Sequence, residues 1–224
     1  MVDGPTAFDW AARYADQNTP WDLGAPHPEL VERLRSGAWT PETLGGARAL
    51  VPGCGRGHDA IALARAGWEV VAIDLVEAVA SSLEPALENL GSRFLLGDAL
   101  THEEGQPFDL VFEHTFFCAI PRERRGDWGE LVRRTLEVGG HVAVLLFPVD
   151  RPLDLGGPPH GVRLEDYAEA LGEGFSCLEG GPSPNPVTRR NWDEGVALFR
   201  RDSRASATRQ QEELEPSVPA PRAR

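Results

Sequence analysis

The chain of 224 residues contains no lysine, so all 22 of its basic residues are arginines. Without a lysine amine, the chain cannot form a Schiff base or build a phosphate-binding loop that ends in Gly-Lys-Ser/Thr. Cysteine is also scarce, since Cys54, Cys118 and Cys177 are far apart and odd in number. A disulfide framework and a Cys-x-x-Cys metal knuckle are therefore excluded, no metal is expected, and a reducing cytoplasm is the expected location.

Long apolar runs and an excess of basic residues are missing too. No stretch of 18 apolar residues occurs, and the first residues show no basic segment followed by an apolar one. We therefore expect neither a membrane partner nor export. The formal net charge of −13 argues against a nucleic-acid partner, because phosphate binding needs a basic face. A small molecule is the expected partner.

An alternation of strand and helix patterns begins at Arg48. Apolar runs predict strands at 48–51, 68–73, 92–96, 108–113, 140–147, 175–179 and 196–200. Helical patterns lie at 57–66, 75–90, 122–136 and 164–171, after a short helix at 28–35. This order predicts an α/β fold with a doubly wound, Rossmann-like sheet whose ligand lies at the carboxyl ends of the strands.

Three parts of the chain are expected from these patterns. The α/β domain should span residues 48–201, preceded by an N-terminal segment, 1–47, that packs on it. The last part, 202–224, is polar and lacks aromatic residues. It buries too little apolar surface to offset its ordering entropy, so we expect a disordered tail.

The first strand leads into a glycine-rich loop, Pro52-Gly53-Cys54-Gly55-Arg56-Gly57. Glycines accept positive φ angles and let a ligand approach the backbone, and the helix that follows presents free amide groups. A dinucleotide site needs GxGxxG, but here His58 stands where that pattern requires its third glycine. The spacing GxGxG, with an acid ending the second strand, instead indicates S-adenosylmethionine.

The acid that ends the second strand is Asp74, followed by Leu75. Its carboxylate suits the two ribose hydroxyls of a nucleoside. After the third strand, Asp98 suits the exocyclic amine of adenine, and the backbone near Ala99 suits a ring nitrogen. A helix cap is the alternative role for Asp98.

The N-terminal segment is rich in aromatic residues, namely Phe8, Trp10, Tyr14, Trp21 and Trp39. Such rings ordinarily pack into the core of a domain. The alternative is a lid, since a cationic cofactor placed against several rings gains about 1 to 2 kcal/mol of cation–π stabilisation.

Four stretches resemble the thiopurine S-methyltransferase superfamily, and within it the halide/thiol methyltransferase branch. They are 18–22 (NTPWD), 50–59 (LVPGCGRGHD), 108–120 (FDLVFEHTFFCAI) and 156–159 (GGPP), and the likeness runs from about Phe8 to Arg200. It implies the fold of class I S-adenosylmethionine-dependent methyltransferases. In that fold the sheet is mostly parallel, with an antiparallel strand near the C-terminus and an N-terminal lid.

The resemblance also implies roles for particular residues. The lid and cofactor positions would be Trp10, Tyr14 and Trp21, and the stretch from Glu113 to Phe117 would form the cofactor and substrate wall. Arg125 matches a family arginine that faces the active site, with a solvated helix arginine as the alternative. His160 follows GGPP, where relatives usually carry an aromatic residue.

The expected function is methyl transfer by in-line displacement from S-adenosylmethionine to a small soft nucleophile: a thiol, a thiopurine, hydrosulfide or a halide. The candidate catalytic residues are Arg125, His160 and His114, although His114 could instead be a histidine satisfied by core partners. The expected cofactor contacts also include Glu113 and His114, and the expected acceptor contacts are Trp21, Phe116, Phe117, Arg125 and His160. A nicotinamide oxidoreductase and an inactive cofactor-binding protein are the alternatives. A monomer is expected.

Overall fold

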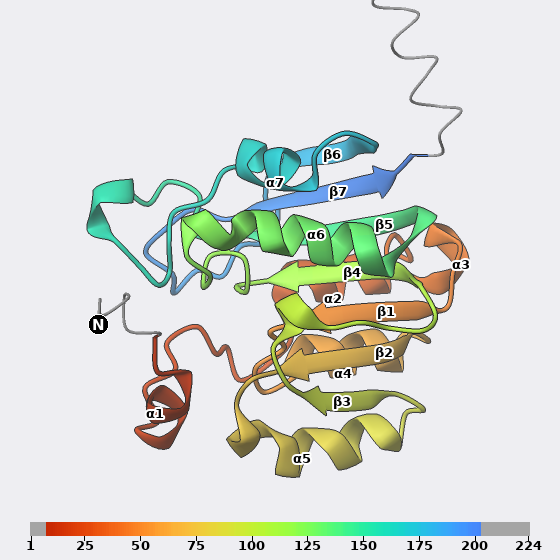
Figure 1. Cartoon of the computed structure of the whole chain (residues 1–224), viewed down its shortest axis with the longest axis horizontal. Coiled ribbons are helices and arrows are strands. Elements are labelled where there is room, and N and C mark those ends of the chain that lie inside the picture. The colour runs from red at the N-terminus through yellow and green to blue at the C-terminus, as the bar shows by residue number, and fades with distance from the viewer. Residues whose placement is uncertain (1–7, 203–224) are drawn as a thin grey trace, which may run out of the picture.

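The computed structural model describes residues 8–202, which form a seven-stranded sheet with the order β3-β2-β1-β4-β5-β7-β6 (Figure 1). The strands are β1 (Arg48–Pro52), β2 (Glu69–Asp74), β3 (Arg93–Leu96), β4 (Phe108–His114), β5 (Leu136–Leu146), β6 (Phe175–Pro182) and β7 (Gly195–Arg201). β7 is antiparallel to both of its neighbours, and the other pairings are parallel. The predicted doubly wound sheet with a C-terminal antiparallel strand is confirmed.

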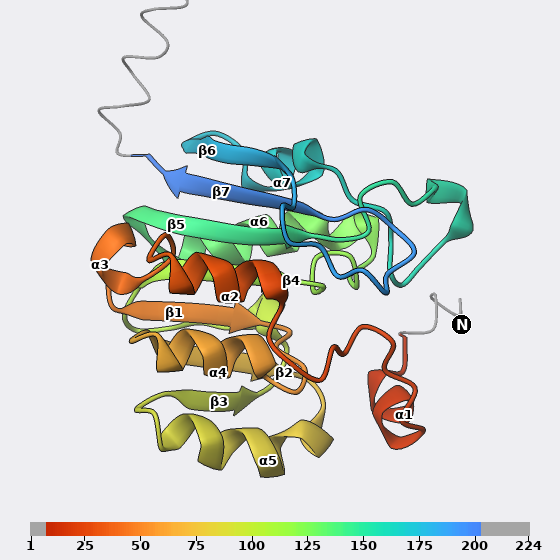
Figure 2. The same ribbon diagram turned by 180° about the vertical axis from the view of Figure 1, so that it is seen from behind.

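Helices cover both faces of this sheet. α6 (Arg125–Thr135) and α7 (Leu164–Leu171) lie on one face, and α2 (Pro28–Arg35), α4 (His58–Arg65) and α5 (Glu77–Glu88) lie on the other (Figures 1 and 2). Alternate residues of β1 serve the two cores: Leu50 packs in the α6–α7 core, and Ala49 and Val51 pack in the opposite one. Strands buried on both faces explain the continuous apolar runs of the sequence.

The chain order reverses at β1, whose neighbours are β2 and β4. The carboxyl ends of parallel strands on either side of such a point leave a crevice in which ligands bind. After the roles expected from the sequence, we call the edge formed by the ends of β1, β2 and β3 the cofactor half, and the edge formed by β4, β5, β6 and β7 with their loops the acceptor half.

Several predicted boundaries are wrong. The helix expected at 122–136 begins with a 3-10 turn, η2 (Arg122–Arg124), and α6 ends at Thr135. β5 starts at Leu136, four residues before the predicted Gly140, because Leu136 already pairs with Phe108 across an irregular register. β6 continues to Pro182, since Gly180 and Gly181 pair with β7 rather than opening a loop.

The N-terminal segment divides into two parts. Leu30 of α2 and Trp39, which precedes α3 (Pro41–Leu44), are fully buried in the core beside α4. α1 (Trp10–Ala15) lies apart from them, on the same side of the molecule as the loop between β5 and α7 (Figure 1). The short 3-10 turns η1 (Ala99–Thr101) and η3 (Leu153–Leu155) complete the elements.

None of the helices in the described part of the chain has the length and apolar character needed to cross a membrane. The predicted disordered tail, 202–224, lies outside the described residues except for Asp202, so it stays a prediction.

Candidate functional site

The glycine loop follows β1 and has space for no larger residue at two of its positions. Gly53 has a φ of +60°, and a Cβ atom there would lie 2.2 Å from Cδ2 of Phe116. Gly57, the N-cap of α4, has a φ of +75°, and its Cβ atom would lie 2.2 Å from Cδ1 of Leu83. Both the left-handed backbone and the close contacts therefore require glycine.

Asp74 lies beside this loop at the end of β2. Its Oδ2 accepts a hydrogen bond from the backbone N–H of Gly55 at 2.7 Å, and its Oδ1 accepts one from Val76 at 3.0 Å. Burial raises the pKa of Asp74. A carboxylate offers about four acceptor positions, so two backbone amides leave capacity for further donors.

Two exposed leucines flank Asp74. Leu75, which follows it, is 57% exposed, and Leu96, its register partner on β3, is 53% exposed. Apolar side chains at adjacent strand ends offer a surface on which a flat ring can lie. Asp98 lies two residues after Leu96, and its Oδ1 accepts from the N–H of Leu100 at 3.0 Å, capping η1. The cap uses one carboxylate oxygen of Asp98, so its predicted contact with adenine stays a prediction, and Ala99 is buried.

Aromatic residues of α1 and the following turn cover the glycine loop. The ring of Trp21 contacts those of Trp10 and Tyr14 edge-on, at 5.3 and 5.9 Å between centroids. The hydroxyl of Tyr14 lies 3.0 Å from the position of a Cβ atom at Gly55, and burial raises the pKa of Tyr14 to about 12. Asp22 adds an ion pair with Arg56 of the loop, at 2.8 Å. The three predicted lid aromatics are therefore brought together over the loop.

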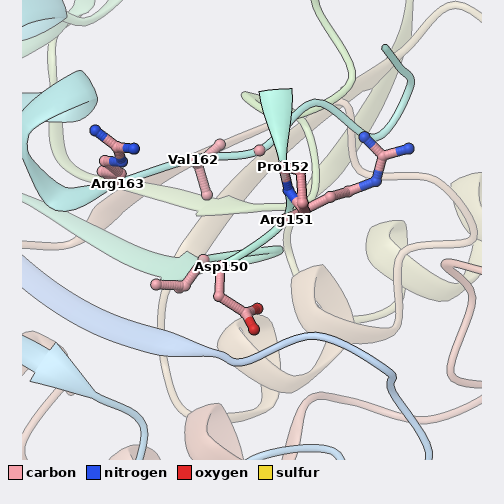
Figure 3. Close-up of a pocket in the computed structure, with 7 residues that line it drawn as sticks. Asp150, Arg151, Pro152, Val162 and Arg163 are labelled. Atoms are coloured by element: carbon pink, nitrogen blue, oxygen red, sulfur yellow. The ribbon is translucent and has the colours of Figure 1, made fainter. Parts of the chain in front are cut away.

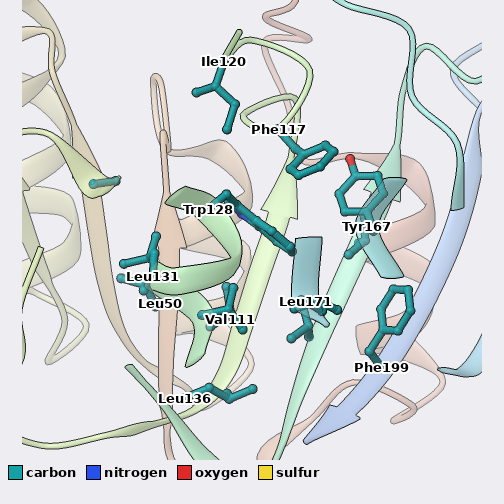
Figure 4. Close-up of a cluster of buried hydrophobic side chains, with 14 of the residues drawn as sticks. Leu50, Val111, Phe117, Ile120, Trp128, Leu131, Leu136, Tyr167, Leu171 and Phe199 are labelled. Carbon is teal, nitrogen blue, oxygen red and sulfur yellow. The ribbon is translucent and has the colours of Figure 1, made fainter. Parts of the chain in front are cut away.

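Glu113 and Phe117, predicted to contact cofactor and acceptor, instead lie in the core. Glu113 is fully buried and accepts hydrogen bonds from the N–H groups of Phe116 and Phe117 and from the hydroxyl of Tyr167, each at 2.8 to 2.9 Å. Burial raises the pKa of Glu113 to about 7. Phe117 stacks on Tyr167 at 4.1 Å and meets Trp128 edge-on (Figure 4). Only Phe116, half-buried against Gly53, reaches the cofactor half.

Arg125 and His160 lie near each other in the acceptor half. Arg125 is 6% exposed, so the alternative of a solvated helix arginine is wrong. Its guanidinium donates to Gly161 O at 3.0 Å and Asp166 Oδ2 at 3.2 Å, and lies over the Phe117 ring. Burial and the charge of Arg125 lower the pKa of His160. A neutral imidazole is therefore favoured at this position.

His114, at the end of β4, joins a buried polar cluster that the sequence patterns missed. Its Nδ1 lies 2.7 Å from Oδ2 of Asp59, and its Nε2 lies 3.1 Å from Nη2 of Arg190. Arg190 also donates to Glu194 at 2.6 Å, and its guanidinium lies over the ring of Phe147. Asp59 stood in a quoted motif, but Arg190 and Glu194 belong to an irregular proline-containing loop in which periodicity gives no signal.

Two neighbouring cavities open in the acceptor half. One of about 170 Å³ is lined by Val149, Asp150, Arg151, Pro152, Gly161, Val162 and Arg163 (Figure 3). The other, of about 600 Å³, shares Val149 and Arg163 with it and extends to Arg190 and Trp192. Its volume falls within the usual range for small-molecule sites.

The geometry therefore combines a glycine cradle beside a carboxylate with a second half that holds buried arginines, rings and cavities. A family model described as Thiopurine S-methyltransferase matches residues 6–201. This chain belongs to the thiopurine S-methyltransferase family. It is accordingly an S-adenosylmethionine-dependent methyltransferase, and the nicotinamide alternative is not supported.

Similar proteins agree with this membership. Probable thiol methyltransferase 2 of Arabidopsis thaliana is 34% identical over 72% of this chain and 70% of its own length. Thiocyanate methyltransferase 1 of the same plant is 32% identical over 86% and 84% of the two lengths. Among solved structures, the Burkholderia thailandensis 1,6-didemethyltoxoflavin-N1-methyltransferase has a TM-score of 0.66 at 20% identity, over 90% of this chain and 94% of its own. That structure shows the fold alone.

The residues of the cofactor half fit S-adenosylmethionine. The cradle takes no Cβ atom at Gly53 or Gly57, the Asp74 carboxylate keeps acceptor capacity, and Leu75 and Leu96 provide an exposed apolar surface beside it. These features match, in turn, an approaching polar chain, ribose hydroxyls and a flat base.

Proposed function

We propose that this methyltransferase acts on a small, soft nucleophile, with thiols, thiopurines, hydrosulfide and halides as acceptor classes. The names of its relatives, which specify thiol, thiocyanate and thiopurine, support a sulfur acceptor. The observation that carries the proposal is a pair of buried guanidinium groups on aromatic rings in the acceptor half. Arg125 lies 4.7 Å from the ring centroid of Phe117, and Arg190 lies 4.1 Å from that of Phe147. Buried cations beside apolar rings favour an anionic, polarisable acceptor.

In this proposal the cofactor half holds S-adenosylmethionine. Asp74 accepts from the ribose hydroxyls, the backbone from Pro52 to Gly57 faces the amino-acid part, and Leu75 lies against adenine. Trp10, Tyr14 and Trp21 act as a lid, formed by α1 and the turn after it. When bound, the cofactor supplies an electrophilic methyl group. The chain's own task is to hold the acceptor in line and exclude water, which can lower the barrier by roughly 7 to 11 kcal/mol.

A soft anion attacks without a general base, so the relevant proton is the one a thiol loses before attack. A nearby cation lowers the pKa of a thiol and so raises the thiolate fraction. We assign this role to Arg125, with His160 contributing shape rather than charge because its imidazole is held neutral. His114 is already bonded on both ring nitrogens.

The test is an acceptor panel with labelled S-adenosylmethionine. It contains thiocyanate, iodide, hydrosulfide, alkyl thiols and aromatic thiols, with a phenol and an amine as hard acceptors, and both volatile and soluble products are measured. Methylation of sulfur or iodide in preference to oxygen and nitrogen is expected. Turnover of the hard acceptors alone would overturn the proposal, and cofactor binding without any turnover would favour the inactive cofactor-binding alternative.

Two variants test the source of the positive charge. In Arg125→Ala, the acid limb of the thiol-methylation rate should move to higher pH, because the bound thiol loses the cation that favours its thiolate. In His160→Ala the limb should stay in place. Unchanged profiles in both variants would remove the assignment to Arg125.

The assembly and location of the enzyme belong to the proposal as well. We expect a monomer acting in a reducing cytoplasm. Cys54, Cys118 and Cys177 are all free thiols, and Cys54 lies in the glycine loop, where oxidation would place new polar atoms against the cofactor.

A further inference from the structure

Two buried histidines lie edge-on to each other where the N-terminal segment meets the end of β4. His27 precedes α2 and is 1% exposed, and its ring centroid lies 4.9 Å from that of His114, with the planes at 82°. Each ring nitrogen of both residues has a polar neighbour, so their tautomers follow from which neighbours can donate.

The neighbours assign opposite tautomers to the two rings. Nδ1 of His27 accepts from the backbone N–H of Glu29 at 3.1 Å, so Nε2 carries the proton and donates to Glu194 Oε2 at 3.1 Å. Arginine has donors only, so Nε2 of His114 must accept from Arg190. The proton of His114 therefore sits on Nδ1 and is donated to Asp59 Oδ2.

Asp59 receives donors on both of its oxygens. Oδ1 accepts from the backbone N–H of His27 at 2.8 Å, and Oδ2 accepts from His114. Asp59 lies in the first turn of α4, directly after the glycine loop. Asp59 therefore links α4, which begins at the cofactor half, to His114, which contacts Arg190.

Arg190 in turn holds the acceptor half together. Nη1 donates to Glu194, and Nη2 lies 3.5 Å from the carbonyl oxygen of Trp21. The neighbouring Arg189 donates to the carbonyl oxygen of Leu23 at 2.9 Å. The loop between β6 and β7 therefore holds the backbone at Trp21 and Leu23, where the aromatic cover of the glycine loop ends. Arg190 also lines the 600 Å³ cavity.

We propose that Asp59 is a positioning residue for the acceptor half: it fixes the Nδ1–H tautomer of His114, so that Nε2 accepts from Arg190 and holds the β6–β7 loop against the cover. This inference rests on the proposed function, since it assigns the acceptor to that half. Burial lowers the pKa of His114, and Arg190 and His27 act in the same direction against the opposing charge of Asp59. The ring is therefore neutral at neutral pH, as the arrangement requires.

The sharpest variant is Asp59→Asn, which keeps the shape of the side chain and replaces one acceptor by a donor. If the amide oxygen of the new side chain accepts from the N–H of His27, its NH₂ group faces Nδ1 of His114. Nδ1 must then accept, the proton moves to Nε2, and two donors meet at Arg190.

Nitrogen-15 NMR of the imidazole rings reports the tautomer of each histidine directly, without substrate turnover. In the wild type, His114 should show the Nδ1–H tautomer and His27 the Nε2–H tautomer, with the resonances assigned through His27→Gln and His114→Gln. In Asp59→Asn only His114 should change, which makes His27 an internal control. An Nε2–H tautomer of His114 in the wild type would overturn the proposal before any variant is considered.

Kinetics then connects the tautomer to function. For Asp59→Asn we expect kcat/KM for the acceptor to fall roughly 10- to 100-fold, the range found when the hydrogen-bond partner of a metal-ligating histidine is removed. Calorimetric affinity for S-adenosylhomocysteine should change little, because Asp74 and the glycine loop are untouched. Asp109→Asn is the matched control: Asp109 accepts from the N–H groups of Ala47 and Arg48 where β1 and β4 begin, so its loss should lower thermal stability without changing the tautomer.

An altered melting temperature in Asp59→Asn with wild-type tautomers and acceptor kinetics would show a purely structural role and contradict the proposal. Failure of the proposed function has a different signature. The wild type would then methylate none of the soft acceptors, while the two histidines still showed opposite tautomers.

Discussion

The cofactor half and the acceptor half of this sheet edge are built from contacts of very different range. Gly53, Gly55 and Asp74 lie within about one βαβ unit, and a single hydrogen bond of 19 residues' separation joins the loop to the acid. Residues of the acceptor half are instead held by distant segments: Arg190 contacts Trp21 across 169 residues, and His114 contacts Asp59 across 55. The first half is one continuous piece of chain, whereas the second exists only once distant segments have met.

This difference has an energetic consequence. Ordering a short loop costs little more than the local backbone entropy, and the β1–α4 turn is already held by backbone hydrogen bonds. The acceptor half instead depends on buried charged side chains that pair with one another. Removing one partner leaves the charge of the other buried and uncompensated. Substitutions in the cofactor half should therefore change the affinity for the cofactor alone. Substitutions in the acceptor half should disturb several buried contacts at once.

The largest effect is expected for Asp74→Ala. In the proposed site, loss of the carboxylate removes two charge-assisted hydrogen bonds to the ribose, so affinity for S-adenosylhomocysteine should fall by about 4 kcal/mol, or roughly 1000-fold. Isothermal titration calorimetry measures this. Asp98→Ala is the comparison, since Asp98 caps η1 and should cost less. Equal losses in the two variants would show that the carboxylate of Asp74 has no special place in the cofactor half.

A pH-dependent effect is expected for Glu113→Gln in the acceptor half. The pKa of Glu113 is raised by burial to about 7, from 4.5 in the unfolded chain, so the folded state binds more protons between these values. Wild-type stability should therefore fall as pH rises from about 4.5 to 7, by at most about 3 kcal/mol.

Glutamine keeps an acceptor for the amides of Phe116 and Phe117 and offers a donor to the Tyr167 oxygen, so the variant should lack this fall. Urea unfolding from pH 5 to pH 8 gives the comparison. A stability difference between wild type and Glu113→Gln that stays constant over this range would refute the assignment.

A smaller effect is expected for Trp21→Ala. Trp21 supplies the ring that joins Trp10 and Tyr14 over the glycine loop, and removing a ring from beside a cationic cofactor costs about 1 to 2 kcal/mol. The Kd for S-adenosylmethionine should rise by roughly tenfold, and the Kd for the uncharged-sulfur product S-adenosylhomocysteine should rise by less. Trp192→Ala, beside the large cavity, is the control and should leave cofactor affinity unchanged. An equal effect of both variants would argue against a lid.

S-adenosylmethionine carries a positive charge on its sulfur, and S-adenosylhomocysteine does not. A cation–π contribution acts only on the charged cofactor, so the loss specific to Trp21→Ala is the part by which S-adenosylmethionine binding falls more than S-adenosylhomocysteine binding. The two ligands measured together therefore separate charge recognition from ordinary packing, and the larger loss should belong to the charged one.

The smallest effect is expected for Arg189→Ala. Arg189 is exposed and contributes hydrogen bonds to the carbonyl oxygens of Asp22 and Leu23. Because water can replace an exposed donor, kcat/KM should fall by only about twofold. Arg190→Ala is the buried counterpart and should lose far more. Similar losses of kcat/KM in the two variants would contradict the distinction between the exposed Arg189 and the buried Arg190.

Much of the cofactor half could be predicted because its signals are local. Gly53, Gly57 and Asp74 are set by backbone conformation and by the end of a strand, both of which leave a pattern in neighbouring residues. Periodicity also gave the positions of the strands along the chain, but it missed the start of β5, since Leu136 pairs with Phe108 before Gly140, where the strand was predicted to begin.

The residues of the acceptor half were harder to place. Glu113 and Phe117 stand in a recognisable motif, yet both side chains are buried in the core, where Tyr167 of α7 donates to Glu113 and stacks on Phe117. Arg190 and Glu194 have no pattern of their own, and their burial depends on Phe147, His27 and His114.

The sequence by itself determined the doubly wound sheet, the glycine loop and the acid beside it, because these follow from apolar periodicity and from the φ angles that only glycine accepts. Only the tertiary structure decided the tautomers of the two histidines and the anchoring of Arg190. A buried polar group takes its protonation and direction from the partners that surround it, and those partners come from parts of the chain that meet only in the folded protein.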